Sequence, residues 1–128
     1  MSDPDNPLDW VSYAEEDFSA AKMMLRQKKP LLLSSCFHSQ QCAEKYPKAV
    51  LVAQNVDFPK THDIPMLDTL CNQHGVFTGF DKSMLAKLSE HAVHTRYPGI
   101  DLTLEEARES FEIVKIIRKF SRKWLGIK

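Results

Sequence analysis

The sequence predicts an all-α protein, built as an antiparallel up-and-down four-helix bundle with one additional short helix. Apolar residues recur every three or four positions in four long segments, and residues typical of helix starts and stops lie between them. No segment alternates apolar and polar residues as a half-buried strand does. A chain of 128 residues, 43% of them hydrophobic, suits one core. We therefore expect a flexible lead-in over residues 1–8 and a single helical domain over residues 9–128.

The first two helices are expected over residues 9–28 and 31–52. Asp9 is a plausible N-cap of the first helix, and Pro30 precedes the second. Apolar residues at helical spacing define one face of each helix: Trp10, Ala14, Phe18, Ala21 and Leu25, then Leu32, Cys36, Ala43 and Val50. Pro47 removes one backbone hydrogen bond and costs about 3 kcal/mol inside a helix. We therefore expect the second helix to be kinked or broken near Tyr46.

Three further helices follow from their end signals. Asp63 can cap a short helix that has Pro65 in its first turn and runs to about Gln73. Asp81 can cap the next helix, which carries an apolar face and closes at a Pro-Gly pair, residues 98 and 99. Thr103 and Glu106 form a capping box for the last helix. Its apolar face comprises Leu104, Ala107, Phe111, Val114, Ile117, Phe120 and Trp124.

Composition excludes several classes of function. Seventeen basic and seventeen acidic residues balance, so the chain has no general attraction to nucleic acid or to an anionic membrane. The longest apolar run is far too short to cross a bilayer. The three cysteines, Cys36, Cys42 and Cys71, form no C-x-x-C pair, and we expect Cys36 and Cys42 to be buried structural thiols. These features favour a soluble protein of a reducing, cytoplasmic compartment without membrane contact.

One polar face of the second predicted helix is a candidate binding surface. His38, Gln41, Lys45 and Lys48 recur at spacings of three and four residues and so share this face. Most charged helix faces are simply solvated. Glutamine and histidine are unusual residues for that purpose, so a polar groove for a ligand or a self-association surface remains an alternative.

The stretch HAVHTRYPG, residues 91–99, is the second candidate site. Arg96 can cap the end of its helix, where the helix dipole favours a cation. Alternatively, Arg96 offers a fork for phosphate, Tyr97 a stacking ring, and His91 or His94 a proton carrier. A metal site from this histidine pair with Cys71 or Glu90 is the weakest alternative, because structural zinc sites show other spacings. We expect neither a metal nor a cofactor.

Several short motifs occur together in one order. Phe37, Gln40, Gln41, Glu44 and Lys45 form an aromatic-x-x-Gln-Gln-x-x-Glu-Lys pattern, which Pro59, Thr61-His62 and Arg96-Tyr97-Pro98 follow. With these motifs the chain resembles the HEPN domain family (higher eukaryotes and prokaryotes nucleotide-binding), in its Arg-Tyr-Pro version, from Trp10 to the last helix. The resemblance implies a four-helix bundle that commonly dimerises and often acts with a small nucleotidyltransferase in a two-component, toxin–antitoxin-like pair.

The resemblance does not imply one activity. Many members of that family are metal-independent ribonucleases with an Arg-x4-6-His motif, and no arginine of this chain has a histidine at that distance downstream. The order here is reversed, His91-x4-Arg96. We therefore expect a module that binds nucleotide or RNA phosphate through Arg96, Tyr97 and His94, with Lys45, Gln41 and His38 as further candidates. The alternatives are an endoribonuclease using His91, His94 and Arg96, and a non-catalytic dimeric interaction bundle.

Overall fold

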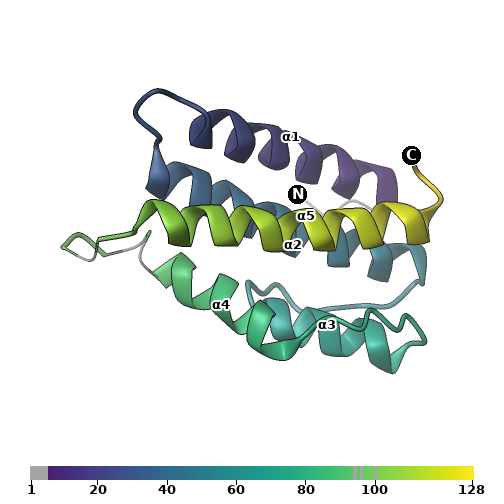
Figure 1. The fold of residues 1–128 in the computed structure, drawn as a ribbon. Coiled ribbons are helices and arrows are strands. Elements are labelled where there is room, and N and C mark those ends of the chain that lie inside the picture. The colour runs from purple at the N-terminus through teal and green to yellow at the C-terminus, as the bar shows by residue number, and fades with distance from the viewer. Residues whose placement is uncertain (1–5, 94, 96, 100) are drawn as a thin grey trace.

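The computed structural model describes residues 6–93, 95, 97–99 and 101–128. In this part of the chain all regular elements are helices, as the sequence predicts. They are α1 (Pro7–Leu25), α2 (Leu32–Ala53), α3 (Ile64–Gln73), α4 (Lys82–Val93) and α5 (Leu104–Leu125). α1, α2 and α5 lie lengthwise beside one another, and α3 and α4 lie along their far side (Figure 1). α2 contacts each of the other four helices and is the central element of the fold.

The N-caps of α3 and α5 are those predicted, whereas α4 ends at Val93 and not at the predicted Pro-Gly pair, residues 98 and 99. Asp63 accepts a hydrogen bond from the Met66 amide and begins α3, and Thr103 and Glu106 form both bonds of a capping box on α5. The prediction of Asp9 as the first N-cap is wrong. Asn6 is the N-cap, because its side chain accepts from the Leu8 amide and Pro7 occupies the first helical position, where no amide donor is needed.

α2 continues through Pro47, so of the two outcomes predicted near Tyr46, a kink or a break, the break does not occur. The helix is a single element from Leu32 to Ala53, with Pro47 inside it. Tyr46 and Ala49 are fully buried, and the proline itself is also buried. Burial of this segment against neighbouring helices supplies stability of the same order as the cost of the proline, about 3 kcal/mol.

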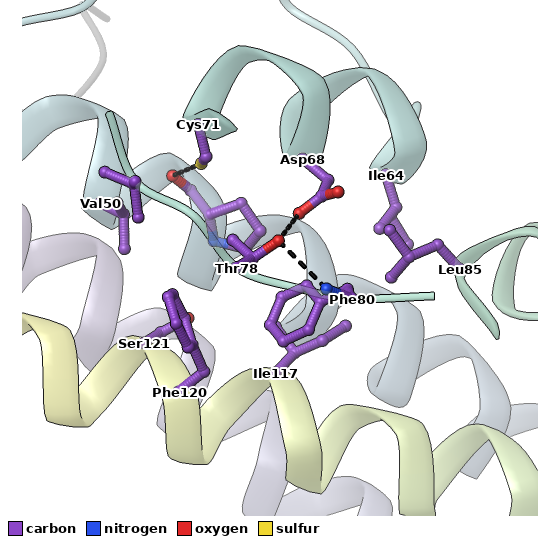
Figure 2. A pocket seen from close by; sticks show the side chains of 12 residues that line it. Val50, Ile64, Asp68, Cys71, Thr78, Phe80, Leu85, Ile117, Phe120 and Ser121 are labelled. Carbon is purple, nitrogen blue, oxygen red and sulfur yellow. Dashed lines mark hydrogen bonds between the residues drawn. The ribbon is translucent and has the colours of Figure 1, made fainter. Parts of the chain in front are cut away.

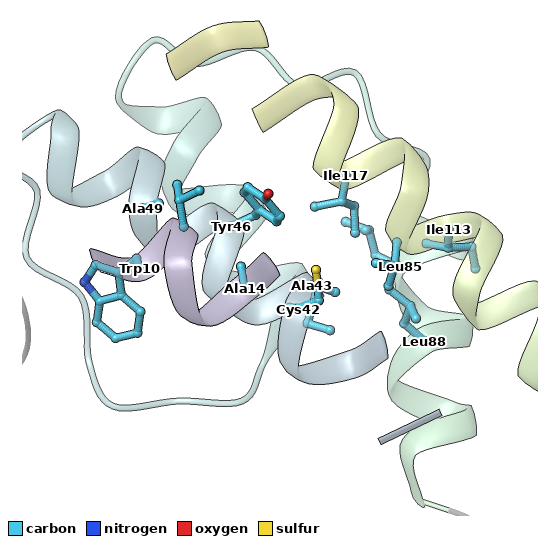
Figure 3. Close-up of a cluster of buried hydrophobic side chains, with 13 residues drawn as sticks. Trp10, Ala14, Cys42, Ala43, Tyr46, Ala49, Leu85, Leu88, Ile113 and Ile117 are labelled. Atoms are coloured by element: carbon cyan, nitrogen blue, oxygen red, sulfur yellow. The ribbon is translucent and has the colours of Figure 1, made fainter. Parts of the chain in front are cut away.

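The main hydrophobic core lies where α1, α2, α4 and α5 meet (Figure 3). Alanines with no exposed surface, among them Ala14 on α1 and Ala43 on α2, allow these two helices to approach closely. Leu85 and Leu88 attach α4 to the same core, together with Ile113 and Ile117 of α5. The position of α4 therefore depends on a few large apolar side chains.

The three cysteines are buried, as the sequence predicts for Cys36 and Cys42. Cys36 and Cys42 are buried free thiols, and burial raises the pKa of both. Burial likewise raises the pKa of Cys71 to about 12. Thiols of this kind are poor nucleophiles at neutral pH. Among the described helices, none combines the length and the apolar character that a membrane span requires.

Candidate functional site

Two open hollows lie at the C-terminal end of α4. The first, of about 450 Å³, is lined by Gln40 and His62 on one side and by Ala92 and Val93 of α4 on the other. We call it the Gln40 hollow. The second, of about 230 Å³, is lined by Phe37 and His38 of α2 and by Thr95, just past α4; we call it the Phe37 hollow. Val93, the last residue of α4, lines the first hollow, and Thr95 lines the second.

A buried carboxylate orients the histidine of the Gln40 hollow. Glu44 is 2% exposed, and its two oxygens lie 3.1 and 2.9 Å from Nδ1 of His62. The His62 side chain keeps 67% of its surface. A carboxylate on Nδ1 favours the tautomer that leaves Nε2 available as a proton acceptor or hydrogen-bond partner. The Glu44 carboxylate therefore fixes the orientation of the His62 imidazole at the edge of the hollow.

The Phe37 hollow has a second histidine held in the same way. Nδ1 of His38 lies 2.8 Å from Oδ1 of Asp17, a residue of α1 that is 8% exposed. The other carboxylate oxygen of Asp17 accepts from the Lys45 ammonium. One buried carboxylate thus positions His38 and neutralises Lys45. Through these two residues the polar face of α2 contacts α1.

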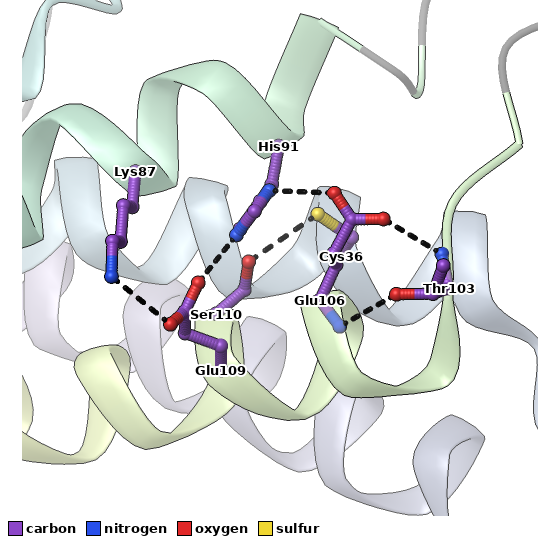
Figure 4. A network of polar contacts seen from close by, with 7 residues as sticks. All are labelled: Cys36, Lys87, His91, Thr103, Glu106, Glu109 and Ser110. Carbon is purple, nitrogen blue, oxygen red and sulfur yellow. Dashed lines mark hydrogen bonds and ion pairs between the residues drawn. The ribbon is translucent and has the colours of Figure 1, made fainter.

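His91 is held inside the protein (Figure 4). Its Nε2 lies 2.7 Å from Oε1 of Glu109, and its Nδ1 lies 3.4 Å from Oε2 of Glu106. The hydrogen bond from His91 lowers the pKa of Glu109, as does Lys87, whose ammonium lies 3.4 Å from the same carboxylate. His91 is only 6% exposed. These contacts favour a structural role, in which His91 joins α4 to α5.

Comparison with known proteins shows the family of this chain. The HEPN domain matches residues 8–124, nearly the whole chain. This chain belongs to the HEPN domain family. A similar protein is "Putative toxin MJ1304" of Methanocaldococcus jannaschii, with 26% identity over 139 aligned positions that cover 93% of this chain and 90% of that protein. No solved structure matches.

The motif residues of this HEPN domain do not all face the same way. Gln40 lines the hollow named after it, while Glu44 contacts Nδ1 of His62. Gln41 is half-buried and lines neither hollow. The Lys48 ammonium lies over the rings of Trp10 and Phe58, 5.5 and 5.9 Å from their centres. The ligand-binding candidates on α2 are therefore separated: His38 reaches a hollow, and Lys45 is paired within the chain.

The stretch HAVHTRYPG is described only in part. His94 and Arg96 lie outside the described residues, so their role as site residues stays a prediction. Tyr97 is 59% exposed, which leaves its ring open to a ligand. Thr95, which lies between His94 and Arg96 in the sequence, lines the Phe37 hollow. Its hydroxyl donates a hydrogen bond to the Ala92 carbonyl.

A tight cavity elsewhere in the HEPN domain is structural (Figure 2). Its volume is about 10 Å³, which holds one water molecule at most. At its edge the Thr78 hydroxyl donates to Asp68 at 2.5 Å, and the Cys71 thiol faces the Pro47 carbonyl at 4.0 Å. Burial raises the pKa of Asp68 in spite of that hydrogen bond. The hydrogen bond between Thr78 and Asp68 holds the loop after α3 against that helix, which is a structural role.

The described residues contain no cluster of three or more histidine, cysteine, aspartate or glutamate side chains suited to a metal ion. The carboxylates that orient the histidines, Asp17 and Glu44, were not predicted as site residues. A signal was present, because Asp17 falls on the apolar face of its helix, three residues after Ala14 and four before Ala21. An acidic residue on a buried face requires a partner that compensates its charge.

Proposed function

We propose that this HEPN protein binds nucleotide or RNA phosphate at the C-terminal end of α4, as the toxin-like component of a cytoplasmic two-component system. Arg96 supplies the phosphate fork, with Tyr97 as a stacking ring and His94 as a further donor. α1, α2, α4 and α5 would form the four-helix bundle of a single domain over residues 9–128. The relative described as a toxin supports this assignment.

One observation carries the proposal. Two hollows, each lined by a histidine whose Nδ1 contacts a buried carboxylate, are bounded by Val93 at the end of α4 and by Thr95 just after it. Oriented imidazoles beside an arginine fork and an aromatic ring form a set that recognises phosphate and base together. Lys45 and Gln41 lie farther along α2: Lys45 is paired with Asp17, and Gln41 lines neither hollow.

The test is thermal unfolding with AMP, ATP and a short RNA. A ligand that binds only the folded protein stabilises it by about 2.7 kcal/mol at a hundred times its Kd. We expect a rise in Tm that Arg96→Ala abolishes. Lys119→Ala, which removes one exposed cation on the outer face of α5, should keep the rise. If none of these ligands raises the Tm, the proposal is contradicted and Arg96 is better explained as a helix cap.

The oriented histidines favour a second candidate, a metal-independent endoribonuclease. In such a reaction the RNA 2′-hydroxyl attacks its own phosphodiester, an imidazole takes the hydroxyl proton, and the 5′-oxygen leaves with a proton. His38 and His62 have the carboxylate on Nδ1 that this role uses. The RNA of the binding experiment separates the candidates, since intact RNA supports binding and shortened RNA with a cyclic phosphate supports cleavage.

The proposal includes a homodimer and a small nucleotidyltransferase as partners. Residues 30–43 contain no Lys, Arg, Asp or Glu, although Leu33 and Phe37 are 49% and 44% exposed. Depletion of charge around exposed apolar side chains is typical of the centre of a protein interface. We expect the protein to dimerise through this surface. A gene for a small nucleotidyltransferase beside that of this protein would support the two-component assignment.

A charge placed in that surface tests the dimer. We expect Phe37→Asp to convert the dimer to a monomer without unfolding it, because Phe37 is exposed in the single chain. Light scattering measures the mass, and circular dichroism checks the helices. Ile116→Asp is the matched control, since Ile116 is 48% exposed on α5 and lies outside the uncharged segment. A wild type that is monomeric at high concentration contradicts this part of the proposal.

A further inference from the structure

Phe77 projects into solvent from a loop whose other side chains are fixed. The residue is 79% exposed, the largest fraction among the large apolar residues that the structure describes. Its two neighbours are held in place: Val76 is 1% exposed, and the Thr78 hydroxyl donates to the Asp68 carboxylate. An aromatic ring in water forgoes the free energy that burial would supply. The ordered loop therefore holds an unburied ring at the surface, where a ligand can reach it.

The loop that carries Phe77 lies against the C-terminal half of α5 (Figure 2). The ring of Phe80 meets that of Phe120 edge to face, with centroids 5.3 Å apart. Lys123 and Trp124 follow Phe120 by three and four residues, so they lie on its side of α5, next to the loop. Both are exposed. We call Phe77, Lys123 and Trp124 the Phe77 surface.

Positive charge is concentrated at this end of α5, although the whole chain is neutral. Residues 115–128 contain six Lys and Arg and neither Asp nor Glu. Glu15 of α1 neutralises part of this charge, whereas the described residues provide no acidic partner for Lys123. The one acidic residue of the loop over residues 74–81, Asp81, is bonded to Ser83 at the start of α4. The Phe77 surface is therefore both aromatic and cationic.

We propose that the Phe77 surface binds single-stranded RNA, with a base stacked on the Phe77 ring and a phosphate beside Lys123. Exposed rings among unpaired cations suit a single strand, because every base has a face that stacks and every phosphate carries a negative charge. A duplex offers this surface only phosphates, since its bases are already stacked on one another. This contact is separate from the hollows at the C-terminal end of α4.

The length of α4 determines which RNA reaches both places. The helix has 12 residues, so its two ends lie about 18 Å apart. A mononucleotide occupies one end only, whereas a strand of several nucleotides can contact both. Two linked contacts bind more tightly than either one alone, because the second forms at a high effective concentration. This preference for a strand rests on the proposed function, in which RNA phosphate binds at the C-terminal end of α4.

Fluorescence anisotropy with a labelled oligouridylate of about ten nucleotides tests the stacked base. We expect Phe77→Ala to weaken binding of this strand about fivefold or more, as loss of one stacked base does. Phe77→Leu should have the same effect and Phe77→Tyr should not, because stacking requires a ring. Binding of AMP, measured by calorimetry, should be unchanged in all three variants. Met23→Ala, which truncates a residue of α1 that is 59% exposed, is the matched control.

The salt dependence of strand binding tests the cation. We expect Lys123→Ala to reduce the slope of log K against log salt concentration by about 0.7, the value for one phosphate contact with a single strand. Lys115→Ala is the control, because the Lys115 ammonium already lies 3.2 Å from the Glu112 carboxylate. The substituted residues are exposed, so each variant should keep the wild-type Tm within about 2 °C.

The outcomes separate this inference from the proposed function. Equal binding of the strand to the wild type and to Phe77→Ala overturns the inference and leaves the site at the end of α4 in place. Equal binding of the strand and of its annealed duplex also overturns it, because the surface then attracts any polyanion. Binding of neither AMP nor the strand overturns both proposals. A strand that binds through Phe77 in a protein that does not bind AMP supports the inference and contradicts the site at the end of α4.

Discussion

Replacing Leu88 with alanine is expected to lower the free energy of unfolding by about 3 kcal/mol and the Tm by about 10 °C. Leu88 is 1% exposed and packs in the main core from the middle of α4. Truncation removes apolar contact and leaves a cavity that the surrounding helices fill only partly. Circular dichroism at increasing temperature or urea concentration measures the loss.

The same variant tests how α4 supports the candidate site. Both hollows are bounded by the end of this helix, so a loosened α4 should also weaken any ligand-induced rise in Tm. Ile116→Ala is the control, because Ile116 is 48% exposed and its truncation should cost less than about 0.5 kcal/mol. A loss below about 1 kcal/mol for Leu88→Ala would mean that α4 contributes little to the packed core.

The helices could be predicted from the sequence mainly because their signals are local. Apolar spacing and caps act within a few residues, so α3 and α5 begin at their predicted residues. The start of α1 was missed because Asn6 and Asp9 are both good N-caps, and Pro7 decides between them. The break predicted at Pro47 was wrong for a different reason. Its cost is local, whereas the burial that offsets it comes from helices distant in sequence.

The candidate site was less predictable, because its contacts are long-range. Asp17 and His38 are 21 residues apart, and Glu44 and His62 are 18 apart. No periodicity shows which acidic residue will meet which histidine. His91 illustrates the converse: its place in the motif suggested chemistry, but Glu106 and Glu109 of the last helix hold it within the structure. Side-chain type alone could not distinguish these two situations.

Glu15→Ala is expected to be the second most damaging substitution, because one carboxylate joins three helices. Its oxygens accept two hydrogen bonds of 2.7 Å from Arg118 of α5, and a further bond from the Tyr46 hydroxyl of α2. Arg122 lies 3.5 Å away. The alanine variant leaves the tyrosine hydroxyl and the Arg118 guanidinium without this acceptor.

We expect a loss of about 2 kcal/mol, below the 3–5 kcal/mol typical of a fully buried pair. The reduction reflects solvent screening, because the Glu15 and Arg118 side chains are each about 30% exposed. Chemical denaturation at neutral pH measures the loss. Glu16→Ala is the matched control, since Glu16 is the exposed neighbour on the same helix and should cost less than about 0.5 kcal/mol.

The dependence of this loss on pH identifies its cause. Burial raises the pKa of Glu15, but the hydrogen bonds from Arg118 and Tyr46 outweigh it, so the folded pKa lies below the ordinary value of 4.5. The stabilisation is therefore complete above that value and disappears as the pH falls through the folded pKa. The difference between wild type and Glu15→Ala should be constant from about pH 8 to 5 and shrink at lower pH. A difference that persists unchanged into strong acid would show that packing of the Glu15 side chain, and not its charge, holds α1 against α5.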